Sequence, residues 1–337
     1  MVNKMEKILS ISIAAYNVST VIKKCLDSFI ASKYIDIIEL IVVDDGSIDE
    51  TVSVVLKYVK QFPNSIRLIS KINAGHGSTI NVSMANAKGK YFKIVDGDDW
   101  VNTIEFDSFI EKLINLDVDL VISNYNEVYS NKVKKVNSIN KYEINRIYGF
   151  IELNPKIYFP MHSLTVKLQT LKLVNEKISE YKFYVDSEFI FFATMYAESI
   201  IFFKEYVYQY RLGQNGQSVS PMSVYNHIED LMDIIYRLLK IYDKRKRSIV
   251  LEKKQKYLFN LINIFYKQLY SWFLIMYKFD KYKKLKIFDK KIKKEFPLYV
   301  NDFDLGVYKF VPLNYYIVLK IARFLKPIQM KIKNIFN

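Results

Sequence analysis

Short apolar runs and amphipathic stretches alternate along residues 8–123 of the chain. Apolar runs of the kind found in buried strands cover residues 8–14, 39–43, 66–70, 91–95 and 119–123. Apolar side chains at helical spacing cover residues 18–31, 50–61, 78–87 and 104–115. This alternation predicts an α/β fold with a mainly parallel sheet that is covered by helices on both faces.

Polar clusters follow three of the predicted strands. They are Ala15-Tyr16-Asn17, Asp44-Asp45-Gly46-Ser47 and Asp96-Gly97-Asp98-Asp99. Because ligands of open α/β sheets bind outside the carboxyl ends of the strands, we expect the three clusters to converge on a nucleotide-type site. The alternative is a set of solvated acidic turns, since Asp and Gly are common turn residues.

The third cluster places three carboxylates, Asp96, Asp98 and Asp99, within four positions. Crowded carboxylates repel one another, and a hard divalent cation relieves that repulsion. Mg²⁺ or Mn²⁺ is commonly held by one or two carboxylates together with the phosphates of a substrate. The cluster therefore predicts a metal-dependent enzyme that acts on a diphosphate compound.

The rest of the chain has a different character. Residues 126–145 are rich in Asn, Lys and Ser and indicate an exposed excursion, residues 184–197 a helix and residues 199–210 a strand. The net charge is +15, and residues 237–337 hold 25 of the 50 Lys and Arg but 7 of the 35 Asp and Glu. We expect a catalytic domain in residues 1–220 and a helical, basic, aromatic-rich region in residues 221–337.

This charge asymmetry indicates an anionic membrane surface or a nucleic acid as partner of the basic region. Residues 315–336 mix aliphatic and basic side chains and suit a membrane surface, although a solvated lysine-rich face is an equal alternative. Residues 257–277 contain Asn260, Asn263 and Lys267, so we expect an amphipathic helix rather than a transmembrane span.

Cys25 is the only cysteine, which excludes an intramolecular disulfide. No signal peptide is evident at the start of the sequence. We therefore expect a cytoplasmic protein, either free or peripheral on the inner face of the cell membrane.

Four sequence blocks resemble the family 2 glycosyltransferases in their order and spacing. They are Ser12-Ile13-Ala14-Ala15-Tyr16-Asn17, Val42-Val43-Asp44-Asp45-Gly46-Ser47, Asn73-Ala74-Gly75 and Ala87-Lys88-Gly89-Lys90-Tyr91 leading into Asp96-Gly97-Asp98-Asp99-Trp100. The resemblance is specific to about residue 125 and looser to about residue 220. It implies the GT-A fold and transfer of a sugar from a nucleotide diphosphate donor with inversion at the anomeric carbon.

The resemblance also implies roles for single residues. Tyr16, beside Ala15, is similar to the residue that stacks on the nucleotide base, and Asp44 to the acceptor for the ring N–H of the base. Asp96 resembles the aspartate near the ribose and the metal, Asp98 the direct metal ligand, and Asp99 a residue that orients the acceptor sugar. Further residues at the donor are Asn73 and Gly75, where the chain passes close to it, and Arg211, which pairs with the diphosphate. Asp45 either shapes its turn or contacts the ligand.

Transfer to a sugar hydroxyl needs a general base, because the hydroxyl is a poor nucleophile at neutral pH. The block Tyr184-Val185-Asp186-Ser187-Glu188-Phe189 resembles the family's Glu-Asp-x-Glu-Phe block, with Val185 in place of the first glutamate. The resemblance implies that Asp186 is the base. Glu188 is the alternative, and its structural role would be to cap the helix that follows. His162 either lines the acceptor pocket or is a buried structural histidine.

These features predict an inverting transferase that uses a UDP-sugar and Mn²⁺ or Mg²⁺. Its acceptor would be a hydroxyl of a glycan or a lipid-linked acceptor in cell-surface polysaccharide assembly. One alternative is a sugar-phosphate nucleotidyltransferase, which would carry a glycine-rich phosphate loop where this chain has Ala14-Ala15-Tyr16-Asn17. Another is a nucleic-acid-binding protein, although the basic region shows no reading motif, so we expect no nucleic acid partner.

Overall fold

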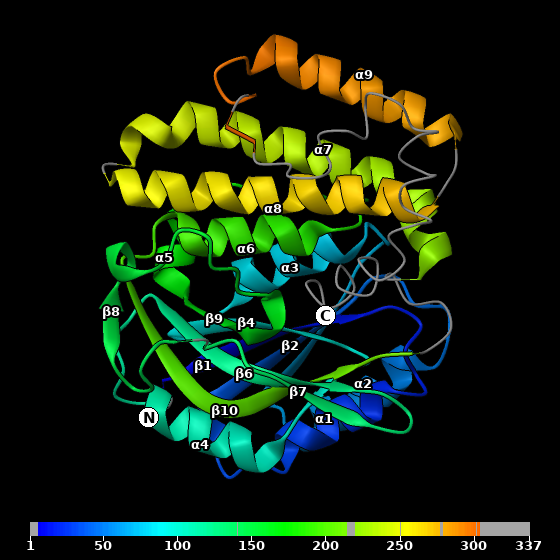
Figure 1. The fold of residues 1–337 in the computed structure, drawn as a ribbon. Helices are drawn as coiled ribbons and strands as arrows, with labels where there is room; N and C mark the ends of the chain where they lie inside the picture. The colour runs from blue at the N-terminus through cyan, green and yellow to red at the C-terminus, as the bar shows by residue number, and fades with distance from the viewer. Residues whose placement is uncertain are drawn as a thin grey trace. The chain divides into compact units, whose positions relative to one another are not determined.

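The computed structural model describes residues 6–139, 141–213, 220–249, 251–276, 279–300 and 302–303. The chain divides into two compact units (Figure 1). The first unit contains residues 1–217 and 248–258, and the second contains residues 218–247 and 259–337.

Within the described residues, the first unit contains one sheet of ten strands. The strand order is β3-β2-β1-β4-β9-β6-β10-β5, with β7 paired to β6 and β8 paired to β10. The pairs β1–β2, β1–β4, β2–β3 and β6–β10 are parallel. The strands are β1 (Leu9–Ala15), β2 (Ile38–Asp44), β3 (Ile66–Ser70), β4 (Tyr91–Asp96), β5 (Trp100–Val101), β6 (Leu120–Val128), β7 (Val133–Val136), β8 (Ile147–Gly149), β9 (Leu164–Lys167) and β10 (Ser199–Arg211).

Helices cover both faces of this sheet, as the alternating pattern predicts. Helices α1, α2 and α4 lie on one face, and α3, α5 and α6 lie on the other (Figure 1). The helices are α1 (Ile22–Ile30), α2 (Thr51–Gln61), α3 (His76–Asn86), α4 (Thr103–Leu113), α5 (Leu168–Lys172), α6 (Val185–Met195), α7 (Pro221–Arg245), α8 (Glu252–Met276) and α9 (Phe279–Glu295). The predicted α/β fold class is confirmed.

Two boundaries differ from the sequence expectation for physical reasons. Helix α1 begins at Ile22 rather than near residue 18, because the backbone N–H groups of Val18 and Ser19 donate to Thr51 Oγ1 at the start of α2 and to Asp49 Oδ2 in the loop before it. Strand β6 continues to Val128, where the sequence indicates an exposed excursion. Its polar side chains Asn124 and Asn126 are buried, because they pair with β10 through amide hydrogen bonds of 3.0 Å.

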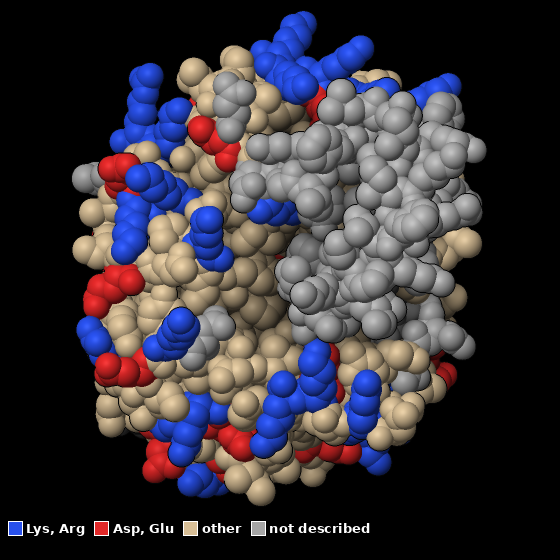
Figure 2. Space-filling view, viewed as in Figure 1, with Lys and Arg blue, Asp and Glu red and all other residues tan. Residues whose placement is uncertain are grey.

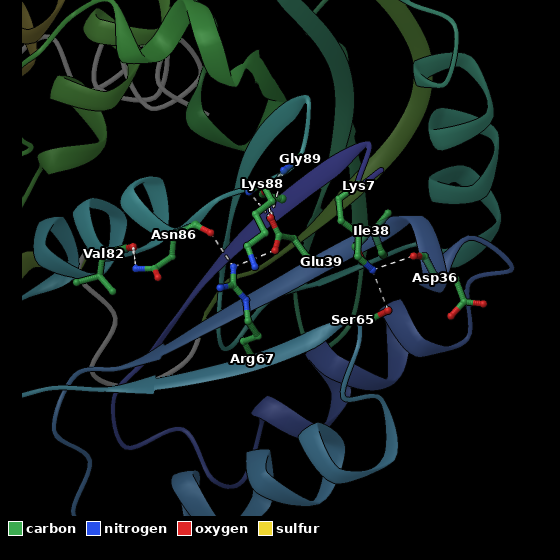
Figure 3. A network of polar contacts seen from close by, with 11 residues as sticks. Lys7, Asp36, Ile38, Glu39, Ser65, Arg67, Val82, Asn86, Lys88 and Gly89 are labelled. Atoms are coloured by element: carbon green, nitrogen blue, oxygen red, sulfur yellow. Dashed lines mark hydrogen bonds and ion pairs between the residues drawn. The ribbon is translucent and has the colours of Figure 1, made fainter. Parts of the chain in front are cut away.

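A buried carboxylate fixes the point where β4 begins (Figure 3). Glu39 on β2 is 4% exposed. It accepts hydrogen bonds from Ser10 Oγ (2.5 Å), the backbone N–H of Lys88 (2.5 Å) and Arg67 Nη2 (2.9 Å). The turn before β4 also packs closely, since a Cβ at Gly89 would lie 2.5 Å from Ser10 N. Glu39 therefore holds the start of β4 against β1 and β2, which sets where β4 ends.

The second unit is helical in its described part and contains α7, most of α8 and α9. Asp289 of α9 is buried and accepts hydrogen bonds of 2.6 Å from the hydroxyls of Tyr266 and Tyr270 on α8. No helix in the described residues has the length and apolar character needed to cross a bilayer. Residues 315–336, predicted to suit a membrane surface, lie outside the described residues.

We expect Glu39→Ala to lower the free energy of unfolding by about 2–3 kcal/mol, because buried N–H donors lose their acceptor. Chemical denaturation measures the change. Glu111→Ala is the control, since its exposed carboxylate lies 3.9 Å from Lys33 Nζ and surface pairs contribute little. Equal losses in the two variants would contradict a stabilising role for Glu39.

Candidate active site

Three parallel strands end side by side at one edge of the sheet. In the strand register, Ala15 of β1 is opposite Asp44 of β2, and Ala14 of β1 is opposite Asp96 of β4. Neighbouring strands lie about 4.8 Å apart. The structure therefore brings Asp44 and Asp96 to the two sides of the end of β1, although they are far apart in the sequence.

The loop after β1 is locked to the loop after β2. Asn17 accepts a hydrogen bond from the backbone N–H of Ile48 (2.9 Å) and donates its own backbone N–H to Ser47 Oγ (3.0 Å). Asp44 is buried and accepts from the backbone N–H of Ser47 (3.1 Å). Tyr16 lies in this locked loop with 51% of its surface exposed. Ala15 is opposite Asp44 in the strand register, so the next residue, Tyr16, presents an exposed aromatic ring just beyond the ends of β1 and β2.

Asp45 has a structural role. Its buried carboxylate accepts from Lys71 Nζ (2.5 Å) and from the backbone N–H groups of Ala74 (3.0 Å) and Gly75 (2.8 Å). These bonds give Asp45 a structural role in the loop formed by residues 71–75, and its contact with a ligand stays a prediction. The loop it holds contains exposed Asn73, and Gly75 has a φ of 82°, which favours glycine.

Asp99 ties the acidic segment to the end of β10. It is buried, and its two oxygens accept hydrogen bonds from Tyr208 Oη (2.6 Å) and from the backbone N–H of Arg211 (2.7 Å). Burial raises the pKa of Asp99 well above its usual value, and the nearby charges of Asp96 and Asp98 raise it further. Asp99 therefore fixes the backbone position of Arg211.

Basic side chains lie beside these acids. His76, the first residue of α3, places Nε2 3.4 Å from Asp96 Oδ1. Burial and Asp96 raise the pKa of Asp98, while Arg211 and His76 act in the opposite direction. The Arg211 guanidinium lies 5.7 Å from the centre of the Trp100 ring, and Lys24 Nζ lies 3.2 Å from it. Acidic and basic side chains therefore share the edge where β4 and β10 end.

A set of donor atoms at this edge fits a divalent cation. Asp96, Asp99 and His162 place potential ligand atoms within 4.8 Å of one another. Burial lowers the pKa of His162 to about 4, so its imidazole is neutral at pH 7, and its Nδ1 has no hydrogen-bond partner. Neutral imidazole and carboxylate are both ligands of Mn²⁺, whereas Mg²⁺ favours oxygen. Asp98, which the resemblance implies as direct ligand, is not part of this cluster but is next to Asp99 in the chain.

His162 is held from two sides. Its ring stacks on Tyr210 with centroids 4.2 Å apart, and its carbonyl accepts from Lys93 Nζ at 2.8 Å. Lys93 is fully buried, which lowers its pKa to about 7. A lysine inside the apolar run 91–95 is a sequence signal for a buried polar contact, but Lys93 was not among the predicted site residues. Tyr208 and Tyr210 were not among the predicted site residues either, although their alternate positions place them on the same face of β10.

Asp186 and Glu188 lie in the first turn of α6 but have different surroundings. Glu188 is fully buried and accepts from the backbone N–H (2.6 Å) and Oγ (2.9 Å) of Ser179. This bond holds a loop that packs on α3, where a Cβ at Gly77 would overlap Ser179 O. Asp186 is half-buried; burial raises its pKa and His76 lowers it. His76 therefore lowers the pKa of Asp186 and also lies beside Asp96.

A different hollow, of about 850 Å³, lies at the opposite ends of the strands. Its lining includes Lys7, Lys90 and Lys167, and its acids among the described residues are Glu6 and Asp117. Asp117 is already paired with Lys167 (2.7 Å) and Lys90 (3.5 Å). The carboxylates that could serve a diphosphate ligand gather at the other end, so we place the candidate active site there.

Residues 10–170 match the family model for Glycosyl transferase family 2. The chain is 32% identical over 117 residues to glycosyltransferase GlyA of Streptococcus pneumoniae serotype 4, covering 35% of this chain and 16% of that protein. It is 26% identical over 223 residues to EpsH of Bacillus subtilis, covering 60% of this chain and 60% of that protein. The chain thus spans less than two thirds of the length of either relative.

The fold is also similar to a crystal structure of S. aureus TarS residues 1–349 in complex with UDP-GlcNAc. The TM-score is 0.66 at 19% sequence identity, with 92% of this chain and 91% of that chain covered. A likeness at this identity establishes the fold alone, and that fold is the GT-A fold. The matched model shows that residues 10–170 of this chain form a glycosyl transferase family 2 domain.

Proposed function

We propose that the chain transfers a sugar from a UDP-sugar to a hydroxyl of a glycan or lipid-linked acceptor, with inversion at the anomeric carbon. The observation that carries this proposal is the placement of Asp44 and Asp96 on either side of the end of β1. Residues 1–220 would form the catalytic domain. Residues 221–337 would contribute to acceptor or membrane association.

The donor would lie across the ends of β1, β2 and β4. Tyr16 offers an exposed ring for the base, and a stacked ring suits a flat ligand. Asp44, with one carboxylate oxygen bound to Ser47 N–H, keeps its other oxygen for the ring N–H of the base. A TarS structure that contains UDP-GlcNAc supports a UDP-sugar as the donor class.

The diphosphate would lie at the acidic edge, near Arg211. Asp96 and Asp98 would hold a Mn²⁺ or Mg²⁺ ion, with Asp99 and His162 as neighbouring donors. When bound, the ion neutralises charge on the leaving diphosphate. Arg211 offers a planar guanidinium for the phosphate oxygens, and the bond from its N–H to Asp99 sets its position. We therefore propose that Asp99, expected to orient the acceptor, acts mainly by positioning Arg211.

Asp186 would act as the general base. Its raised pKa brings the carboxylate closer to the basicity needed to take a proton from a sugar hydroxyl near neutral pH. The deprotonated oxygen would attack the anomeric carbon on the face opposite the diphosphate, which inverts the configuration. Glu188 is committed to Ser179 through both oxygens, which supports Asp186 rather than Glu188 as the base.

Asp98→Ala should weaken metal-dependent UDP binding at least about tenfold, because a carboxylate at the diphosphate would be lost. Isothermal titration calorimetry with UDP, with and without Mn²⁺, measures the effect. Asp36→Ala, an exposed acid that follows α1 and precedes β2, is the control and should bind as the wild type does. Unchanged affinity in Asp98→Ala would reject the proposed metal role of this residue.

Asp186→Asn should reduce kcat by about 10²- to 10⁴-fold, the usual contribution of a general base, while UDP affinity and thermal stability stay unchanged. Screening a panel of nucleotide sugars identifies the donor for the assay. Turnover is then followed by release of the nucleotide diphosphate.

Glu188→Gln is the matched comparison on the same helix turn. It should lower the midpoint of thermal unfolding, because Ser179 loses a charged acceptor. Its folded fraction should keep most of the turnover. If Asp186→Asn turned over at the wild-type rate and Glu188→Gln did not, the assignment of the base would be reversed.

A further inference from the structure

Helix α9 has two opposite faces in the second unit. Its inner face contains Leu285, Phe288, Ile292 and the hydrogen-bonded Asp289, all of which are buried. Phe288 packs on Tyr266 of α8 with ring centroids 5.9 Å apart. The spacing of these side chains matches one stripe of an α-helix, so the inner face attaches α9 to its neighbours.

The flanks of α9 are engaged with α7. Lys284 pairs with both carboxylate oxygens of Glu229 at 2.7 Å. Lys291 Nζ lies 3.5 Å from the centre of the Tyr236 ring, and Tyr236 Oη donates to Glu295 (2.5 Å). These contacts fix the rotation of α9 about its axis, and they leave the face opposite the buried stripe turned to solvent.

That outer face is basic with one aliphatic residue at its centre. Lys283, Ile287, Lys290 and Lys294 follow one another at helical spacing, and all four are exposed. Ile287 is 67% exposed. Along residues 283–295 the acids are Asp289, which is buried, and Glu295, which is bound to Tyr236. Figure 2 shows lysine side chains gathered at the top of the view, where Figure 1 places α9.

We propose that the outer face of α9 docks the protein on an anionic lipid surface. Lysines on one helix face match a layer of anionic headgroups, and each contributes to binding through the surface potential. Ile287, which is 67% exposed, would enter the boundary between headgroups and acyl chains. The fixed rotation of α9 presents the lysines together, so no ordering of the helix is needed on binding.

The composition of this face favours lipid over nucleic acid. Single-stranded nucleic acids are held by aromatic side chains that stack on the bases, and duplexes are often held by the planar guanidinium of arginine. Residues 283–295 contain neither arginine nor an aromatic residue on the outer face, since Phe288 is buried. An exposed isoleucine among lysines is instead the pattern of an interfacial helix.

The test uses the full chain and co-sedimentation with two kinds of vesicle, phosphatidylcholine alone and an equimolar mixture with phosphatidylglycerol. We expect binding to the anionic vesicles only, and weaker binding at high salt because surface charges are screened. The double variant Lys290→Gln/Lys294→Gln should partition roughly 30-fold less, from the usual contribution of two lysines. Ile287→Ser should lower partitioning severalfold at unchanged charge.

Lys57→Gln/Lys60→Gln is the matched control, because it removes two exposed lysines from α2 in the first unit. It should bind vesicles as the wild type does, and thermal unfolding should show that all variants are folded. Equal binding to neutral and anionic vesicles would overturn the proposal. So would wild-type binding by the α9 variant, or tighter binding to an oligonucleotide than to anionic vesicles at the same salt. Sugar transfer need not occur for any of these results, so they test the surface independently of the proposed activity.

Discussion

The parallel register of β1, β2 and β4 is the constraint on which the candidate active site depends. Hydrogen bonding between parallel strands sets which residues end opposite one another, and here it sets Asp44 and Asp96 beside the end of β1. A shift of one residue would turn every side chain of a strand to the other face of the sheet. Glu39 opposes such a shift at the start of β4, because its carboxylate binds the turn that leads into that strand.

Burying several acids at one edge has an electrostatic cost, and the structure offsets it locally. Asp99 is bound by Tyr208 and by the backbone N–H of Arg211, while His76 lies against Asp96. The pKa of Asp98 nevertheless remains raised, because the effects of burial and of Asp96 outweigh those of Arg211 and His76. A cluster that repels itself in this way gains most from a cationic ligand or from a metal-bound diphosphate.

Much of this arrangement could be predicted from the sequence, because it depends on local patterns. The alternation of strands and helices predicts the covered sheet, and the polar clusters after the strands predict the edge where Asp44 and Asp96 lie. The contributions of β10 and His162 could not be predicted in the same way. Tyr208 and His162 reach the acids through pairings between segments far apart in the sequence, and periodicity does not encode such contacts. Likewise, the polar residues Asn124 and Asn126 are buried because β10 supplies their partners.

Strand β10 contributes more to the site than its position along the chain indicates. It supplies Tyr208, Tyr210 and Arg211 to the acidic edge, yet it begins at Ser199, well after the segment 10–170 that matches the family model. The matched segment therefore contains Asp96, Asp98 and Asp99 but not Tyr208 and Arg211, the two residues that bind Asp99. A change confined to β10 could therefore alter the surroundings of Asp96 and Asp99 while every residue of the matched segment stays the same.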